Sequence, residues 1–363
     1  MRWLLYSGVL AFVVSSAAMP VVSKISRRLG AVSETGGRHV GKVPIGRLGG
    51  IGVLIGCIFG ALLQVWMSAQ FRDALAQNQI QLIGIAIGLS MVASVGFIDD
   101  VKRLSAGVKF WVQILAALVV YACGVRISAV DLPLIPPIGL SWFSLPVTLV
   151  WIVGIINAIN LIDGLDGLAG GVLLFASIIN LVVALNSNST ITAVLMVSIV
   201  GAIVGFLLFN WYPAKIYLGD GGAYSLGFLI AINGLIAPMQ KVSTGIAIIV
   251  PVLAAGLPII DTTLVMLRRI ANRRGLFSPD RGHLHHLLLD SGISHRRVVI
   301  GLYFVCCIFC SIALTLVLHR NRSVGLFLVL ASIGGFIVWG FGVKSQLWQA
   351  MDRLKKNIFK KSK

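Results

Sequence analysis

The sequence predicts an all-α, polytopic membrane protein, and three observations support that prediction. Hydrophobic residues make up 58% of the 363 residues and charged residues only 12%, which is about half the charged fraction of soluble domains. Uncharged apolar runs long enough to cross a bilayer as helices recur along the chain. The basic residues gather in alternate segments between these runs, as expected for a protein that crosses a membrane repeatedly.

About eleven transmembrane helices are predicted, because a helix of about 20 apolar residues spans the hydrocarbon core. The runs lie at 3–23, 49–69, 80–98, 109–124, 143–160, 167–185, 190–210, 222–238, 243–267, 298–318 and 323–343. The first run follows one arginine, as in a signal peptide, but it is long and has no small-x-small cleavage site. We therefore interpret it as a retained first span.

The distribution of Lys and Arg predicts which loops face the cytoplasm. With the N-terminus outside, the inner segments are 24–48, 99–109, 161–168, 211–221, 268–297 and the C-terminal tail 344–363. These segments contain 24 of the 30 basic residues, so the positive-inside rule places them and the C-terminus in the cytoplasm. The net charge of +18 then reflects orientation, and no nucleic-acid partner is predicted.

The chain is predicted to divide into a membrane part and a short tail. Residues 1–343 form an integral membrane domain whose inner loops carry the candidate catalytic residues. The tail 344–363 has apolar residues at helical spacing, Leu347, Met351, Leu354 and Ile358, among its lysines. A basic amphipathic helix of this kind lies on the inner leaflet against anionic lipid. The alternative is a plain solvated helix.

Ten of the twelve acidic residues fall on the predicted inner side. Asp99 and Asp100 close the third run, Asp163 and Asp166 follow the fifth, and Asp220 precedes the eighth. Ionisable groups at membrane depth are costly, so they usually mark function. Adjacent carboxylates repel, and a cation or a shared proton relieves that repulsion. The acids therefore predict a cation or proton site at the inner face.

Amides and an aromatic ring accompany these acids. Asn160 precedes Asp163 by three residues, and glycines in the stretch 157–168 let the backbone approach a ligand. Hydrogen bonding between helices is the structural alternative for the amides. Asp220 stands at a predicted helix start, where free N–H groups meet phosphate and a carboxylate holds a hard cation. Tyr217, just before it, is interpreted as a ligand contact.

A histidine cluster lies in the longest inner loop. His283, His285 and His286 follow Arg281 in the segment 268–297. Zinc sites prefer other spacings, and no cysteine is near. Histidine and arginine beside carboxylates that hold magnesium fit phosphate binding better. The glycines around Lys42, in the first inner loop, form a weaker candidate for a phosphate loop.

Together these motifs resemble those of the polyprenyl-phosphate N-acetylhexosamine-1-phosphate transferases, a superfamily that includes the peptidoglycan phospho-muramoyl-pentapeptide translocase. The motifs are Gly96-Phe-Ile-Asp-Asp100, Asn157 to Leu168, Tyr217-Leu-Gly-Asp220, and His283-Leu-His-His286 preceded by Phe277-Ser-Pro-Asp-Arg281. Leu284 interrupts the three successive histidines of the peptidoglycan branch. The chain is therefore most similar to bacterial undecaprenyl-phosphate N-acetylglucosamine-1-phosphate transferases of O-antigen and teichoic-acid pathways.

The resemblance implies a role for each matching residue. The catalytic candidates are Asp99, Asp100, Asp163, Asp166 and His283. The metal ligand is Asp220, for Mg²⁺, with Mn²⁺ as the alternative. The substrate-binding candidates are Asn160, Asn210, Tyr217, Arg281, His285 and His286, and Lys42 is added from its loop. In the family, one acid of the pair at 99–100 orients or deprotonates the lipid phosphate, and an aromatic residue stacks on uracil.

The resemblance also implies the reaction. The donor is a UDP-N-acetylhexosamine, with N-acetylglucosamine favoured, and the acceptor is undecaprenyl phosphate. Transfer of the sugar 1-phosphate releases UMP and initiates a lipid-linked cell-envelope glycan at the cytoplasmic face of the bacterial inner membrane. Direct attack is favoured over a phospho-aspartate intermediate. Membrane lipids are further partners, and a homodimer is left open.

Two alternatives remain. The same reaction can use another donor, such as a UDP-linked N-acetylated 6-deoxyhexosamine or the muramoyl pentapeptide. A different class is a transporter or flippase, which would have acids near the membrane midplane within an inverted repeat. These acids lie at the inner ends of the runs, and no repeat is evident, so the transferase is preferred.

Overall fold

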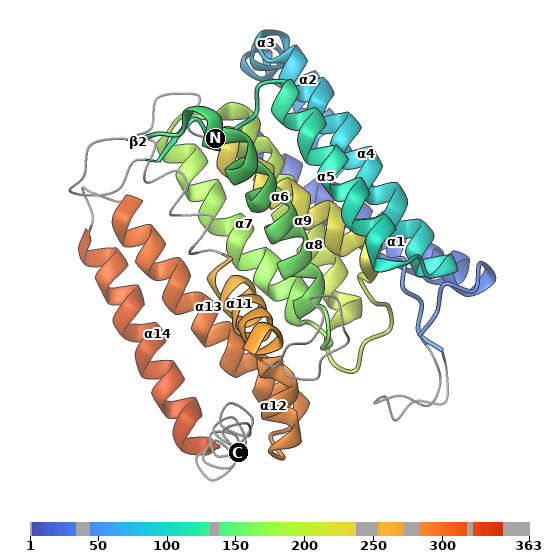
Figure 1. Cartoon of the computed structure of the whole chain (residues 1–363), viewed down its shortest axis with the longest axis vertical. Coiled ribbons are helices and arrows are strands. Elements are labelled where there is room, and N and C mark those ends of the chain that lie inside the picture. Colours follow the sequence, from blue (N-terminus) through green and yellow to red (C-terminus); the bar gives the residue numbers. More distant parts are fainter. Residues whose placement is uncertain are drawn as a thin grey trace.

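Long helices form nearly all of the described structure (Figure 1). The computed structural model describes residues 2–33, 44–130, 138–236, 253, 255–271, 283–317 and 322–343. The helices are α1 (Arg2–Arg28), α2 (Gly49–Met67), α3 (Ala69–Gln77), α4 (Gln79–Lys102), α5 (Ala106–Ala122), α6 (Ser144–Ile162), α7 (Leu168–Asn186), α8 (Thr190–Asn210), α9 (Gly219–Ile236), α11 (Gly256–Ala271), α12 (Leu284–Asp290), α13 (His295–Val317) and α14 (Arg322–Gly342). A short 3₁₀ turn, η1 (Ser141–Phe143), and two antiparallel strands, β1 (Ala129–Val130) and β2 (Ile138–Gly139), connect α5 to α6.

The helices have the length and composition that a bilayer demands. Eight helices of the described chain are long and apolar enough to cross a membrane, namely α1, α2, α4, α6, α7, α8, α13 and α14. The shorter helices α5 and α11 are also apolar. The predicted polytopic, helical membrane protein is therefore confirmed, while the number of spans and their orientation stay predictions.

The run predicted at 222–238 corresponds to α9, which is not among those eight helices. Every residue of α9 is buried except Asp220. The helix packs against α2, α4, α6 and α7. Because protein rather than lipid surrounds it, α9 can contain the glycines, Ser225 and Asn233 that a lipid-facing span avoids.

Some short elements of the structure were not predicted from the sequence, and two predicted segments lie partly or wholly outside the described residues. The short helices α3 and α12 and the strand pair were not predicted, because brief elements in loops leave little periodic signal. Only the second half of the run 243–267 falls in the described residues, as part of α11. The tail 344–363 lies outside the described residues.

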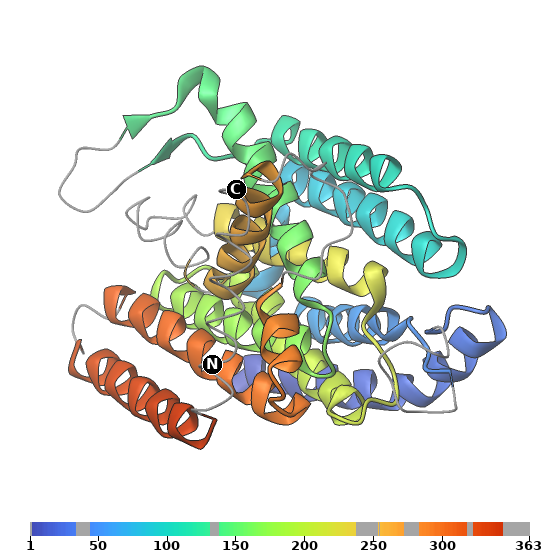
Figure 2. The same ribbon diagram turned by 60° about the horizontal axis from the view of Figure 1, so that its bottom comes forward.

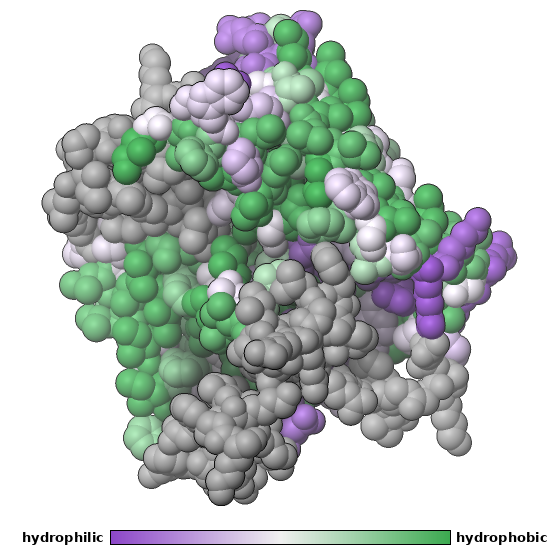
Figure 3. Space-filling model, viewed as in Figure 1, coloured by the Kyte–Doolittle hydropathy of each residue, from purple (hydrophilic) through white to green (hydrophobic). Residues whose placement is uncertain are grey.

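The helices are arranged with α13 and α14 at one edge and with α4 and α5 at the opposite edge (Figures 1 and 2). Hydrophobic side chains cover much of the described surface, and hydrophilic ones gather toward its ends (Figure 3). On α14, for example, Phe327, Val338 and Phe341 are 69%, 73% and 73% exposed. Such surfaces are stable where lipid, rather than water, contacts them.

Glycines allow α2, α4 and α9 to meet closely at one end. A Cβ added to Gly96 of α4 would lie 2.5 Å from the Cα of Gly221 in α9. A Cβ added to Gly50 of α2 would overlap the Cα of Gly222. Small residues let helix backbones approach more closely than side chains would permit. This contact brings the residues at these three helix ends into one place.

The glycine contact predicts a specific sensitivity to added volume. We expect Gly96→Val to lower the apparent Tm in detergent by several degrees, because overpacking costs about 1–3 kcal/mol and about 1 kcal/mol shifts the Tm of a large domain by about 2–4 °C. Gly154→Val is the matched control, since Gly154 is exposed on α6 and has no neighbour within 4 Å of an added Cβ. Equal Tm values for the two variants would contradict the close contact.

Candidate active site

Asp100 holds the first turn of α9. Its Oδ1 accepts the N–H of Asp220 at 2.9 Å, and its Oδ2 accepts the N–H of Gly221 at 3.0 Å. The first N–H groups of a helix have no partner within the helix, and that end carries partial positive charge. A buried carboxylate is therefore well placed there. Asp100 thus joins the end of α4 to the start of α9 and fixes the position of Asp220.

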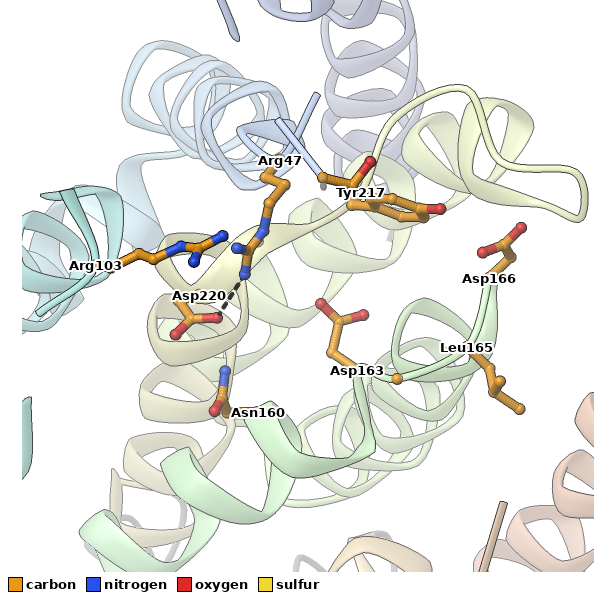
Figure 4. Close-up of a pocket in the computed structure, with 11 residues that line it drawn as sticks. Arg47, Arg103, Asn160, Asp163, Leu165, Asp166, Tyr217 and Asp220 are labelled. Atoms are coloured by element: carbon orange, nitrogen blue, oxygen red, sulfur yellow. Dashed lines mark hydrogen bonds and ion pairs between the residues drawn. The ribbon is translucent and has the colours of Figure 1, made fainter. Parts of the chain in front are cut away.

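Main-chain hydrogen bonds bring the segment before α2 to the start of α9. The N–H of Tyr217 donates to the carbonyl oxygen of Gly46 at 2.8 Å. Gly219 has φ +78°, and a Cβ there would overlap the carbonyl oxygen of Arg47, so glycine is required. These contacts place the Arg47 guanidinium against Asp220 (Figure 4).

Two bases bridge three carboxylates in this cluster. The Arg47 Nη2 lies 3.3 Å from Oδ1 of Asp220 and 3.6 Å from Oδ1 of Asp100. The Lys109 Nζ lies 2.9 Å from Oδ2 of Asp99 and 3.3 Å from Oδ2 of Asp220. Each oxygen of Asp220 therefore has its own basic partner, one from the segment before α2 and one from α5.

A cavity of about 320 Å³ opens beside Asp220, within the size range of small-molecule sites. Its lining residues come from five separate stretches of the chain: Ser33, Arg47, Arg103, Asn160, Asp163, Gly164, Leu165, Asp166, Tyr217, Gly219 and Asp220. In the close-up the Asp163 carboxylate lies between Asp220 and Tyr217 (Figure 4). The structure thus brings together acids that the sequence placed in separate motifs.

The environment of the cavity changes the ionisation of Asp163 and Tyr217. Burial, followed by the negative charge of Asp220, raises the pKa of the Asp163 carboxyl to about 7. An added cation would favour its charged form. Burial also raises the pKa of the Tyr217 hydroxyl, and the charges of Asp166 and Asp163 act in the same direction. Tyr217 therefore presents a neutral aromatic ring to the cavity.

Asn210 and Asp166 shape the wall of the cavity. The buried Asn210 accepts the N–H of Gly167 at 2.9 Å through Oδ1, and its Nδ2 donates to the carbonyl oxygen of Ile216 at 2.9 Å. Both ends of the Asn210 amide therefore hold backbone, and its side chain is not among those that line the described cavity. Asp166 does line it, while its Oδ2 accepts the N–H of Ala214 at 2.9 Å.

The histidine segment 283–286 packs against the loop 163–167, which lines the cavity. The Nδ1 of His283 lies 2.9 Å from Oδ2 of the buried Asp261, whose Oδ1 accepts the N–H of Leu284 at 2.8 Å. A Cβ added to Gly164 would lie 2.6 Å from Nε2 of His285, so that ring packs on the loop 163–167. The rings of His285 and His286 are 4.1 Å apart. Asp261 thus fixes the segment to α11.

The structure adds residues to which the sequence assigned no specific role at the site. Lys109 and Asp261 are lone charged residues within predicted apolar runs, and that position was itself a functional signal. Arg47, just before α2, is a base of the first inner loop that reaches the acids. The remaining two candidates, Lys42 and Arg281, lie outside the described residues.

The donor set suits a magnesium ion that the substrate completes. Among the described residues no three His, Cys, Asp or Glu side chains converge tightly enough to form a ready-made metal cage. Magnesium, however, is usually held by one or two carboxylates together with waters and substrate phosphates. Asp220 and Asp163 both line the cavity, and burial together with the charge of Asp220 raises the pKa of Asp163, a shift that a bound cation would oppose. The cluster therefore fits such an ion.

Comparison with known proteins assigns the chain to a family. The model of glycosyl transferase family 4 matches residues 82–238, a stretch that contains most of α4, the helices α5 to α9 and all the acids of the cluster and cavity. The chain is 34% identical to a Bacillus subtilis protein named probable undecaprenyl-phosphate N-acetylglucosaminyl 1-phosphate transferase, over 85% of this chain and 84% of that protein.

Two further relatives extend the comparison. The decaprenyl-phosphate N-acetylglucosaminephosphotransferase of Mycobacterium leprae is 31% identical over 97% of this chain and 92% of its own. The phospho-N-acetylmuramoyl-pentapeptide-transferase of Halalkalibacterium halodurans is 31% identical over 87% and 98%. Because these similarities run through the carboxylate cluster and across most of each relative, the chain is a membrane-embedded enzyme of glycosyl transferase family 4.

Proposed function

We propose that this enzyme transfers N-acetylglucosamine 1-phosphate from UDP-N-acetylglucosamine to undecaprenyl phosphate and releases UMP. One observation carries the proposal: carboxylates from α4, α9 and the loop after α6 meet two bases around a single cavity. That arrangement suits two phosphate-bearing substrates that must approach each other. The names of the relatives supply the N-acetylglucosamine phosphate group and the polyprenyl phosphate acceptor, and the resemblance of the motifs supplies the UDP donor.

The nucleotide is assigned to the side of the cavity formed by Tyr217 and the loop 163–167. Tyr217 offers a neutral ring on which uracil can stack. Asn160 lines the same cavity and provides both a donor and an acceptor. The diphosphate then extends toward Asp220 and Arg47, where the guanidinium of Arg47 and a cation held by Asp220 would meet its negative charge.

The lipid phosphate is assigned to the neighbourhood of Asp99 and Lys109. Both oxygens of Asp100 bind the backbone of α9, so Asp100 is committed to holding that helix. Asp99 instead pairs with Lys109 at 2.9 Å and accepts the N–H of Leu104 at 2.6 Å. Of the acid pair, Asp99 is therefore the residue proposed to orient the attacking phosphate, and Lys109 would attract it.

The proposed chemistry is a direct in-line displacement. An oxygen of the lipid phosphate attacks the sugar-bearing phosphorus, and the bond from that phosphorus to the bridging oxygen breaks. UMP leaves with the electron pair. Arg47 and Lys109 place positive charge where the two phosphates meet. Magnesium held by Asp220, with Asp163 beside it, would supply charge neutralisation on the diphosphate when bound.

We also propose how the enzyme sits in the bacterial cytoplasmic membrane. The end of α4, the end of α6, the start of α9 and the segment before α2 all meet at the cavity. The distribution of basic residues assigns each of these to the cytoplasm. The proposal therefore comprises eleven spans, an outside N-terminus, a catalytic membrane domain over 1–343 and a cytoplasmic tail.

A panel of donors tests the proposed function. Purified enzyme is incubated with Mg²⁺, undecaprenyl phosphate and each of several UDP-sugars, while released UMP and the mass of the lipid product are measured. We expect turnover with UDP-N-acetylglucosamine. The muramoyl-pentapeptide donor is the second candidate, because the relatives include transferases named for it. Absence of UMP with every UDP-sugar would refute the proposal.

Removing the proposed metal ligand should abolish transfer. We expect Asp220→Ala to reduce turnover by at least about 100-fold, more than the roughly 10- to 100-fold typical of outer-shell partners. Asp73→Ala, at an exposed acid of α3, is the control and should retain wild-type turnover. The measurement is UMP release at saturating Mg²⁺ for protein of matched yield. Normal turnover of Asp220→Ala would show that Asp220 is not the required metal ligand.

The assigned uracil contact predicts a selective change in KM. We expect Tyr217→Ala to raise the KM for the UDP-sugar about tenfold, since stacking of a base on an aromatic ring is worth about 1–3 kcal/mol. The KM for undecaprenyl phosphate should stay unchanged. Tyr217→Phe keeps the ring and should resemble the wild type. An unchanged donor KM in Tyr217→Ala would exclude Tyr217 from the nucleotide site.

The pKa of Asp163 predicts the pH dependence at limiting Mg²⁺. Its carboxyl titrates near pH 7 in the free protein, so it is mostly neutral at pH 6 and mostly charged at pH 8. If the charged form binds the ion, the apparent affinity for Mg²⁺ should rise as the pH increases from 6 to 8. Asp163→Asn should bind Mg²⁺ more weakly and lose most of this dependence. An identical pH profile in that variant would count against the role of Asp163.

A further inference from the structure

The geometry points to Tyr303 and His295 of α13 as positioning residues for the nucleotide side of the cavity. This inference rests on the proposed function and extends it to a helix to which the motifs assign no role. Both residues contact the loop 163–167 from outside the cavity. Through that loop they fix where Asp166 and its neighbours stand.

Tyr303 supports the loop through one hydrogen bond and a fitted ring. Its hydroxyl donates to the carbonyl oxygen of Gly167 at 2.5 Å. The ring fills space that only a glycine leaves open, because a Cβ added to Gly171 would overlap it. Phe175 packs edge-on against the same ring, with centroids 5.5 Å apart. The hydroxyl is thereby held at one place relative to α7.

Both main-chain polar groups of Gly167 are therefore held by side chains of other helices. Its N–H donates to Asn210 of α8, and its carbonyl accepts from Tyr303 of α13. Its φ of +81° lies in the left-handed region, which glycine adopts without steric cost. A residue with this freedom takes its conformation from its partners. Asp166 immediately precedes it, so these two hydrogen bonds help to set the direction of that side chain.

His295 holds the same wall one residue earlier. Its Nε2 lies 3.4 Å from the carbonyl oxygen of Asp166, which accepts the hydrogen bond. Its ring stacks on Tyr212 with centroids 4.5 Å apart and 29° between the planes. Arg296 donates to the carbonyl oxygen of Tyr212 at 3.3 Å. Ala214, in the same turn as Tyr212, donates its N–H to Asp166. The start of α13 therefore contacts both the turn 212–214 and the loop 163–167, which are themselves joined by a hydrogen bond.

These contacts act on one side of the cavity only. Asp166 and Tyr217 lie on the side away from Arg103 and Asp220 (Figure 4). Asp99 and Lys109, assigned to the lipid phosphate, belong to α4 and α5, and these two helices lie at the edge of the bundle opposite α13 (Figures 1 and 2). Loosening the α13 contacts should therefore weaken donor binding and leave acceptor binding intact.

The test is a split between two Michaelis constants. We expect Tyr303→Phe, which removes only the hydroxyl, to raise the KM for the UDP-sugar about three- to tenfold, or about 0.7–1.4 kcal/mol. We expect His295→Ala to have an effect of similar size. In both variants kcat and the KM for undecaprenyl phosphate should change less than about twofold. The Kd for the UDP-sugar with Mg²⁺, measured by calorimetry without lipid, should rise in parallel.

Tyr121→Phe is the matched control, since it removes a hydroxyl near the far end of α5 and should leave every constant unchanged. Donor KM and Kd values equal to wild type in both α13 variants would overturn the inference alone. A fall in Tm with equal changes in both KM values would also overturn it, since that is the signature of general destabilisation. A wild-type enzyme that neither binds nor uses any UDP-sugar would overturn the proposed function, and the inference with it.

Discussion

The architecture of the site depends on one interaction, the carboxylate of Asp100 against the start of α9. A helix that begins inside a protein leaves N–H groups without partners, and here both oxygens of one side chain satisfy two of them. The same contact joins α4 to α9 and turns Asp220 toward Arg47 and Lys109. Without it, α9, the most buried helix of the described bundle, would begin with N–H groups that lack hydrogen-bond acceptors.

Close packing makes that interaction possible. Gly96, Gly50 and the two glycines that follow Asp220 remove the side chains that would keep α2, α4 and α9 apart. In lipid, helices gain nothing by hiding apolar surface from one another, so close contact and hydrogen bonding must hold them together. The two contacts therefore depend on each other: the glycines let the helices approach, and the hydrogen bonds of Asp100 fix the orientation of the start of α9.

Most of the helical architecture was predictable from the sequence, because lipid forces long apolar runs to become helices and basic loops mark one side. The acids of the site were predictable for a related reason, since charge near a membrane is tolerated chiefly where it has a use. Asp99, Asp163 and Asp220 were recognised in this way. Their mutual contacts were not, because nothing in a linear sequence shows which helix ends meet.

The misses have the same physical origin. Asn210 is predicted to contact the substrate, and the structure shows in addition that its amide holds the backbone of Gly167 and Ile216, a local role that the sequence does not indicate. Lys109 stands at the border between a predicted inner loop and a predicted apolar run, and only the structure shows that the turn between α4 and α5 brings it to Asp99. The role proposed for Tyr303 could not be read from the sequence, since it depends on the glycines that face the ring. Tertiary neighbours, and not local patterns, decide such roles.

The shared carboxylate of Asp220 has a thermodynamic consequence. Arg47 occupies one of its oxygens and Lys109 the other, so any ion that takes Asp220 as a ligand must compete with both. Displaced from Asp220, the guanidinium would still neighbour Asp100 and the ammonium would still pair with Asp99, but each would have hydrogen-bond donors left for an incoming anion. Cation and anion would then strengthen each other's binding by equal factors, as linkage requires. Cooperative loading of this kind needs no moving domain, only three side chains that exchange partners.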